Sequence, residues 1–381
     1  MSDGEDEALS DPPISARGKI FGEVVAVVVA LALFGWAVRA NDVWLERHMT
    51  LMYCVADQAQ LAPLHLLRGV VLVLSIVVVV AVRPRLGRWF GRYFGKRSVA
   101  DFAKSAASIV VAILLAFVVT DAYLRFTRSR AVYAPGPPPN LGETMTLDSG
   151  GFRLSGPGET LDPAQDTLVF NGESVAFGYG LPDDATIPVQ VGKSMGMQVR
   201  NIARSGSAND EGFFVLEAEL PKIPKPKAVV TFVVINWLYR NIGIHRNHIV
   251  LGPDGRLEVA PALPEWLWRS PLFDKLRSVY HEADPVEIVR VLLARTAEVV
   301  RARGATPLMV FTQCGVECIS NGPNGPRILQ RLVDGQTYDW IRVDQGPRPL
   351  RLEDFHPNRA GAERYAKEIE KALRAKGIGE K

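Results

Sequence analysis

The chain has 381 residues, a formal net charge of +3 and 48% hydrophobic residues, and its mean hydropathy is +0.07. This mean hydropathy is high for a wholly soluble protein, so we expect part of the chain to lie in lipid. The small net charge argues against a nucleic-acid partner, and the C-terminal two thirds contain no basic patch interleaved with aromatic residues.

Three apolar segments occupy the first third of the chain, at residues 20–38, 66–82 and 105–120. Their length suits helices that cross the hydrocarbon core of a bilayer. The first could instead be a cleaved signal peptide, but residues 1–19 form a long acidic tail that we expect to be disordered, and no clean cleavage site follows the segment. The other two could be buried helices of a soluble bundle, but they lack the polar stripe of such helices. We therefore predict a membrane region at residues 20–124 with three transmembrane helices.

Basic residues predict the orientation of these helices, because Lys and Arg near membrane spans stay in the cytoplasm. The first loop, residues 41–65, carries only Arg47 besides its flanking residues. The second loop carries Arg83, Arg85, Arg88, Arg92, Lys96 and Arg97. The second loop and the N-terminal tail should thus be cytoplasmic. Three spans then place everything after Ala122 outside a bacterial-type inner (plasma) membrane, in the periplasm or the cell exterior, with membrane lipid as one partner.

Residues 125–146 form a linker whose prolines, from Pro135 to Pro139, favour a stiff extended chain. From residue 147 to residue 381, short apolar strands alternate with segments of helical period. We expect strands at 167–170, 199–203, 228–235, 307–312 and 340–343, and helices at 186–195, 211–220, 285–303 and 359–375. This alternation predicts an α/β domain with a parallel sheet covered by helices on both faces. Residues 240–284 interrupt it, either as a cap over a site or as a packed excursion.

Ser174 stands in the stretch TLVFNGESVAFGYGL, residues 167–181. The apolar residues before it predict a buried strand, and Asn171 and Gly172 are a turn signal. Ser174 should therefore sit where a strand leaves the sheet and turns into a helix, which is where open α/β sheets place their chemistry. The plainer alternative is a turn serine without function, and the residues that could assist it decide between the two.

His356 is the candidate base for Ser174, because a serine hydroxyl is a poor nucleophile until a base removes its proton. It stands in RLEDFHPN, in a loop that opens the last predicted helix, with Asn358 as a plausible N-cap. Asp354 and Glu353 can each bring a carboxylate to one imidazole nitrogen and so fix the tautomer. An acidic residue beside a histidine is also a common surface pairing.

An oxyanion hole is the third requirement, since attack on an ester carbonyl places negative charge on its oxygen. Three donors can be proposed: the backbone N–H of Ser174, the backbone N–H of Gly206 just past a strand, and the side-chain amide of Asn236 at the end of AVVTFVVI. An Asn at a strand end is more often a turn former. Here, however, successive strand ends present Ser, Gly and Asn, and a fourth segment presents Asp-x-His.

The order Ser174, Gly206, Asn236 and His356 resembles the SGNH, or GDSL, hydrolase family, whose name lists these four blocks. The resemblance covers roughly residues 166–373, with the blocks NGESVAFGYGL, VRNIARSGSAND, VVINWLYRN and LEDFHPNRAG. It implies a flavodoxin-like three-layer α/β/α fold without metal or other cofactor. It also implies ester hydrolysis or acyl transfer with Ser174 as nucleophile, His356 as base, an adjacent carboxylate, and an oxyanion hole from Ser174, Gly206 and Asn236.

Two residues depart from the family pattern. The Asp usual before the serine is Glu173 here, and the Asp usual after the third-block asparagine is Trp237. Both stand beside the expected oxyanion hole without removing a proposed donor. The family commonly places its acid three residues before the histidine, which selects Glu353, while an Asp-x-His version selects Asp354. We prefer Asp354 and retain both.

The three cysteines are Cys54, Cys314 and Cys318. A metal site at the last two would need more ligands nearby than the segment offers. In an oxidising compartment Cys314 and Cys318 could form a local disulfide, and two free thiols are the alternative.

The leading hypothesis is a membrane-anchored serine esterase that removes an acyl or acetyl group from an envelope glycan or lipid. An O-acyltransferase to a sugar hydroxyl would use the same acyl-enzyme. A hypothesis from another class, motivated by Glu173 and Trp237, is a non-catalytic envelope protein that keeps the fold for assembly or binding.

Overall fold

The computed structural model describes residues 14–49, 58–96, 99–130, 145–156, 158–242, 246–265, 269–273, 283–312, 324–344, 346, 350, 352 and 356–379. The chain divides into two units. The first comprises residues up to 45 together with 59–127, and the second comprises residues 46–58 together with 128–381.

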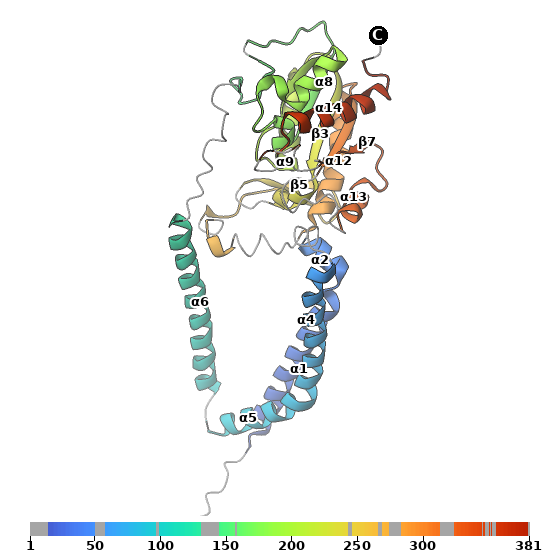
Figure 1. Cartoon of the computed structure of the whole chain (residues 1–381). Coiled ribbons are helices and arrows are strands. Elements are labelled where there is room, and N and C mark those ends of the chain that lie inside the picture. Colours follow the sequence, from blue (N-terminus) through green and yellow to red (C-terminus); the bar gives the residue numbers. More distant parts are fainter. Residues whose placement is uncertain are drawn as a thin grey trace, which may run out of the picture. The chain divides into compact units, whose positions relative to one another are not determined.

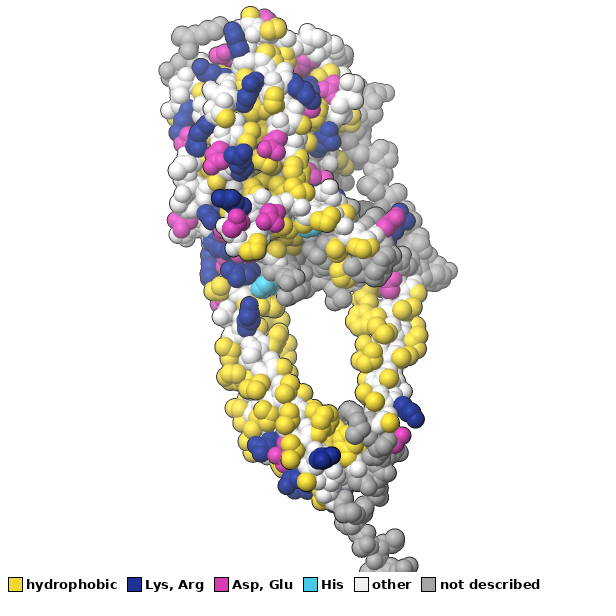
Figure 2. Space-filling model, turned by 180° about the vertical axis from the view of Figure 1, so that it is seen from behind, with side chains coloured by type: hydrophobic (Ala, Val, Ile, Leu, Met, Phe, Trp, Pro, Cys, Tyr) yellow, Lys and Arg dark blue, Asp and Glu magenta, His cyan; other side chains and the backbone are white. Residues whose placement is uncertain are grey.

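The first third of the chain is helical. Its helices are α1 (Ala16–Arg39), α2 (Asp42–His48), α4 (Gln58–Val77), the π-helical turn η1 (Val78–Val82), α5 (Arg83–Lys96) and α6 (Val99–Arg130). Within the described residues, three helical stretches are long and apolar enough to cross a membrane: Ala16–Arg39, Leu61–Phe94 and Ala103–Leu124. The 24 residues of α1 span about 36 Å, enough for a hydrocarbon core of about 30 Å. Large apolar side chains cover the exposed surface of these helices (Figure 2).

The basic segment expected as a loop after the second apolar stretch is the helix α5, and it packs closely on α1. A Cβ at Gly18 would lie 2.6 Å from the carbonyl oxygen of Phe90, and one at Gly22 would lie 2.7 Å from that of Leu86. Small residues therefore allow the two backbones to approach. The π-helical turn η1 comes just before Pro84, which has no N–H to donate and would crowd a regular preceding turn.

The second unit is an α/β fold. Its elements are β1 (Thr167–Asn171), α7 (Ser174–Phe177), η2 (Asp183–Ala185), α8 (Ile187–Met195), β2 (Gln198–Asn201), α9 (Asn209–Glu219), η3 (Leu220–Lys222), β3 (Pro226–Val234), η4 (Ile235–Ile242), β4 (His248–Leu251), β5 (Leu257–Ala260), α12 (Pro285–Ala302), β6 (Thr306–Thr312), α13 (Gly325–Val333), β7 (Asp339–Arg342) and α14 (Arg359–Arg374).

Five of these strands form one parallel sheet in the order β2-β1-β3-β6-β7. This is the strand order of flavodoxin-like folds, and the predicted α/β class is confirmed. Alternate residues of each strand face opposite layers. Leu168 and Phe170 pack with α8 and α14 on one face, whereas Val169 packs with α9 and α12 on the other (Figure 1). The sheet is therefore the middle of three layers.

Several described elements were not expected from the sequence. Among them are the helices α2 and α13, the antiparallel hairpin of β4 and β5 inside residues 240–284, and the 3-10 helix η4, which begins directly after β3. The proline-rich part of the linker, the three cysteines, Trp266 and Trp268 lie outside the described residues. The possible disulfide between Cys314 and Cys318 thus stays a prediction.

Gly172 makes the turn that takes the chain from β1 toward α7. Its φ is +130°, a backbone conformation that residues with a Cβ rarely adopt. A Cβ there would lie 2.9 Å from both the Cβ and the carbonyl oxygen of Phe232 in β3. The turn therefore requires glycine for its backbone conformation and for space.

We predict that Gly172→Ala lowers the unfolding free energy by roughly 2 kcal/mol or more, because backbone strain and overlap with Phe232 add together. Gly196→Ala is the matched control, since Gly196 also has a positive φ, +64°, but has open space around its Cβ position. It should lose about 1 kcal/mol. Urea unfolding of the full chain in detergent measures both, and equal losses would contradict the role given to Phe232.

Candidate active site

Ser174 lies at the carboxyl end of the central part of the sheet. It is the first residue of α7, directly after the turn that ends β1, and its side chain is 4% exposed. The first N–H groups of a helix have no acceptor within that helix, so α7 itself does not use the backbone N–H of Ser174. Gly178 ends this short helix with a φ of +81°. The predicted strand-turn-helix arrangement around Ser174 is present.

His356 lies against Ser174, although the two residues are far apart in the sequence. The Nε2 atom of His356 is 2.8 Å from the Oγ atom of Ser174. His356 precedes α14, where the side chain of Asn358 accepts a hydrogen bond from the Gly361 N–H and caps the helix as expected. The fold thus places an imidazole where it can accept the proton of the Ser174 hydroxyl.

Two aromatic side chains flank the His356 imidazole. The ring centroid of Tyr179 is 4.7 Å from that of His356, and the ring centroid of Trp237 is 6.4 Å from it. Both side chains pack partly buried against the sheet core. Tyr179 comes from the loop after α7 and Trp237 comes from η4. The His356 imidazole is thus contacted by two segments, one that follows β1 and one that follows β3. The sequence singled out Trp237 only because the family that the chain resembles has an Asp there, and it did not predict the contact of Tyr179 with His356.

The two candidate acids, Asp354 and Glu353, lie outside the described residues. The Nδ1 atom of His356, which such an acid would contact, is buried. The choice between the two acids therefore stays a prediction.

Gly206 lies in a turn that is tied to the backbone of Gly172. The carbonyl oxygen of Gly172 accepts hydrogen bonds from the Arg204 N–H at 3.0 Å and from the Ser207 hydroxyl at 3.3 Å. Gly206 has a φ of +80°, and open space adjoins its Cβ position. Asn236 belongs to η4 rather than to a strand end, and its side chain is outside the described part of the chain. Gly206 is thus close in the fold to the turn before Ser174.

Glu173 is a buried carboxyl group directly beside Ser174. Its side chain is 2% exposed and one carboxyl oxygen is 3.2 Å from Nη1 of Arg240. Burial raises the pKa of Glu173 to about 8, although the positive charge of Arg240 and a hydrogen bond from the Val234 backbone act to lower it. The guanidinium carbon of Arg240 lies 3.9 Å from the ring centroid of Trp237, a cation–π contact. Glu173 therefore links the Ser174 turn to η4.

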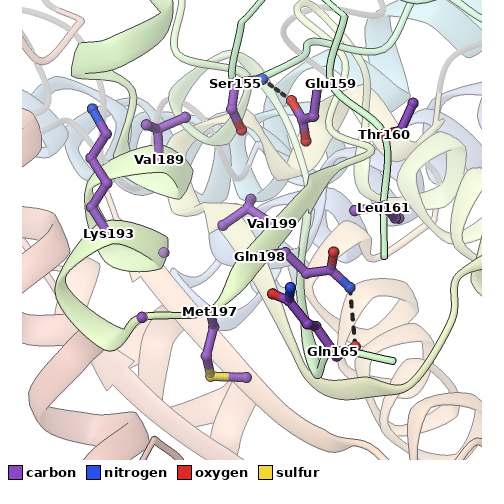
Figure 3. Close-up of a pocket in the computed structure, with 12 residues that line it drawn as sticks. Ser155, Glu159, Thr160, Leu161, Gln165, Val189, Lys193, Met197, Gln198 and Val199 are labelled. Carbon is purple, nitrogen blue, oxygen red and sulfur yellow. Dashed lines mark hydrogen bonds between the residues drawn. The ribbon is translucent and has the colours of Figure 1, made fainter. Parts of the chain in front are cut away.

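A separate cavity of about 440 Å³ lies beside α8 and the edge strand β2 (Figure 3). Lys193 and Glu159 are among its lining residues, and the Glu159 carboxylate accepts a hydrogen bond from the Ser155 backbone. Neither Ser174 nor His356 lines it. Within the described ranges, no group of three or more His, Cys, Asp or Glu side chains is placed to hold a metal ion.

No protein-family model and no curated protein matches the sequence. Solved structures resemble the chain at low identity. An acetyl xylan esterase from Butyrivibrio proteoclasticus is 13% identical, with a TM-score of 0.34 over 58% of this chain and 67% of that one. A family two carbohydrate esterase from Clostridium thermocellum is 14% identical, with a TM-score of 0.38 over 61% and 69%. A member of the lipolytic protein G-D-S-L family from Veillonella parvula is 12% identical, with a TM-score of 0.36 over 55% and 99%.

These likenesses are too low to assign an activity, so the function must be argued from the residues of this chain. The residues that carry the argument are Ser174 and His356, whose side chains form a hydrogen bond. Around them lie one buried carboxyl group, two aromatic rings, and the turns that contain Gly172 and Gly206.

We predict that Glu173 makes the stability of the fold decrease as pH rises. The folded carboxyl group keeps its proton up to a pH of about 8, whereas the unfolded one loses it near its ordinary value of 4.5. Between these values the folded state binds more protons, so the unfolding free energy falls with rising pH. Glu173→Gln is neutral at every pH and should remove this fall.

The melting temperature of both proteins in detergent at pH 5, 6.5 and 8 checks this prediction. The variant should gain stability relative to the unchanged protein as pH rises. Glu298→Gln, on an exposed part of α12, is the control and should show a constant difference across the series. A constant difference for Glu173→Gln as well would contradict the prediction.

Proposed function

We propose that this chain is a serine hydrolase of the SGNH type that acts on ester bonds through an acyl-enzyme on Ser174. The observation that carries the proposal is the 2.8 Å hydrogen bond between Ser174 Oγ and His356 Nε2. A serine and a histidine so placed at the carboxyl ends of a parallel sheet meet the geometric requirement for an activated nucleophile. This bond favours an enzyme over a non-catalytic protein that only keeps the fold.

In the proposed reaction, His356 takes the hydroxyl proton of Ser174 while the oxygen attacks the ester carbonyl. Negative charge then develops on the carbonyl oxygen, where the backbone N–H groups of Ser174 and Gly206 and the side-chain amide of Asn236 would donate hydrogen bonds. His356 next gives its proton to the departing alcohol, which leaves the acyl group on Ser174. Water, activated by the same imidazole, releases the acid and restores the serine.

Asp354 or Glu353 would hold the imidazole in the tautomer that presents an unprotonated Nε2 to Ser174, and would stabilise the imidazolium that forms. The reaction as proposed uses neither a metal nor another cofactor.

We further propose that the enzyme is anchored in a bacterial-type inner membrane by three helices. Its catalytic unit would lie in the periplasm or the cell exterior and act on an ester of an envelope glycan or lipid. The three long apolar helices support the anchor, and the basic residues between the second and third support the orientation. Tyr179 and Trp237 give the site apolar surfaces that suit an acyl chain or the face of a sugar ring. Transfer of the acyl group to a sugar hydroxyl is the alternative outcome of the same acyl-enzyme.

We predict that a fluorophosphonate probe labels the full chain in detergent at Ser174. Ser174→Ala should abolish labelling, and His356→Gln should slow it about a hundredfold or more, because the nucleophile loses its base. Ser205→Ala, at an exposed serine in the Gly206 turn, is the control and should label normally. Intact-protein mass spectrometry measures the labelling. An unlabelled Ser174 in the unchanged protein would refute the proposal that the chain is a serine hydrolase.

Turnover of acetyl and longer-chain esters, with and without a sugar as acceptor, then distinguishes hydrolysis from transfer. Release of free acid at the same rate in both cases indicates hydrolysis, and an acylated sugar indicates transfer.

We predict that Asp354→Asn lowers kcat by orders of magnitude with little change in the unfolding midpoint, and that Glu353→Gln has a mild effect. The reason is that only the acid that orients His356 contributes to the transition state. Steady-state kinetics on the best ester gives kcat, and the opposite ranking would assign the role to Glu353.

A further inference from the structure

Arg153 is a charged side chain buried in the second unit, with 1% of its surface exposed. It precedes β1, in a short segment where Leu147 and Arg153 form an isolated antiparallel bridge. A buried guanidinium is unfavourable unless its donors find acceptors. The positions of its acceptors therefore indicate what the residue does.

Its acceptors lie at the end of α7, where Nη1 reaches the Phe177 carbonyl oxygen at 3.5 Å, and in the segment that follows α7. The guanidinium donates to the carbonyl oxygens of Gly178, at 2.5 Å, and Leu181, and it pairs with Asp183 at 3.0 Å. Asp183 in turn accepts hydrogen bonds from the N–H and hydroxyl of Thr146, at 3.0 and 2.7 Å. Arg153 thus fixes both ends of the loop Gly178–Leu181.

The same loop contacts both members of the proposed catalytic pair. The Tyr179 N–H donates to the Ser174 carbonyl oxygen at 3.0 Å, and the Tyr179 ring lies 4.7 Å from the His356 ring. Gly180 packs so closely on the Leu352 side chain that a Cβ there would overlap it, and the Leu352 N–H donates to the His356 carbonyl oxygen at 2.7 Å. The loop therefore lies between Arg153 and the segment that carries His356.

We propose that Arg153 is a positioning residue for the Ser174–His356 pair. It holds the Gly178–Leu181 loop so that Tyr179 keeps the His356 imidazole in line with the Ser174 hydroxyl. The inference rests on the proposed function, and Arg153 itself does not touch the reacting atoms. Its planar group reaches two carbonyl oxygens and a carboxylate together, which the single ammonium of a lysine cannot do.

The test compares Arg153→Lys with Arg200→Lys in the full chain. Arg200 is the matched control because its described partners, Asp148 and Phe152, lie in the short segment that also contains Arg153 and outside the Gly178–Leu181 loop. Arg153→Lys should lower kcat about tenfold to a hundredfold at nearly constant KM, since a small misplacement of catalytic groups has effects of this size. Arg200→Lys should leave kcat unchanged even if it lowers the unfolding midpoint of the protein.

A double-mutant cycle with Tyr179→Ala separates positioning from general loosening of the fold. If Arg153 acts through Tyr179, the double variant should be no slower than Tyr179→Ala alone. Additive losses, or an unchanged kcat in Arg153→Lys, would overturn the inference. If Arg153→Lys does not fold, Asp183→Asn replaces it, because this change weakens the ion pair that Arg153 makes after the Gly178–Leu181 loop. Asp183→Asn should then lower kcat, and an unchanged kcat would also overturn the inference.

Labelling of Ser174 in the unchanged protein distinguishes failure of the inference from failure of the proposed function. An unlabelled Ser174 refutes both proposals. A labelled Ser174 together with an unaffected Arg153→Lys refutes only the role of Arg153.

Discussion

The site depends on one buried interaction, the contact between the Glu173 carboxyl group and Arg240. The chain turns sharply at Gly172 between β1 and Ser174, but this turn alone does not determine where the segment after β3 lies. Because Glu173 is directly before Ser174 and Arg240 belongs to η4, their contact joins the turn before Ser174 to the segment after β3. The Glu173 carboxyl group is 2% exposed and so has few alternative partners, which favours a single arrangement of the two segments.

Similar polar contacts fix the other loops at the carboxyl end of the sheet. The Asp210 carboxylate, fully buried at the start of α9, pairs with Arg246 at 2.7 Å and accepts a hydrogen bond from the Ile249 N–H. The Asn241 side chain accepts from the Asp210 N–H and donates to Asn209. The apolar core holds the layers together, but these directional contacts decide how the loops that carry the site lie over it.

The fold was largely predictable from the sequence, because short apolar runs mark most of its strands and a helical period of apolar residues marks most of its long helices. Ser174 and His356 could also be predicted from the sequence. Ser174 follows the turn signal at Asn171 and Gly172, and His356 precedes a helix that Asn358 caps. The sequence could not predict three sets of contacts: those of His356 with aromatic rings, that of Arg240 with Glu173, and those of Arg153 with the Gly178–Leu181 loop. Each of them joins residues that are far apart in the sequence and meet only after the sheet has formed. The helix η4 was missed for a related reason: Ile235 continues the apolar run of β3, so the sequence does not mark where the strand ends.

One series of contacts joins Glu173 and Trp237, the residues on either side of Arg240 in the structure. Glu173 is one methylene longer than aspartate, and its carboxyl group reaches Arg240. The guanidinium carbon of Arg240 lies 3.9 Å from the centroid of the Trp237 ring, and that centroid is 6.4 Å from the centroid of the His356 ring. An aspartate at position 237 would give Arg240 no aromatic face to lie on. Glu173, Arg240 and Trp237 therefore form one series of contacts from the residue before Ser174 to the ring of His356, with a cation–π contact in the middle.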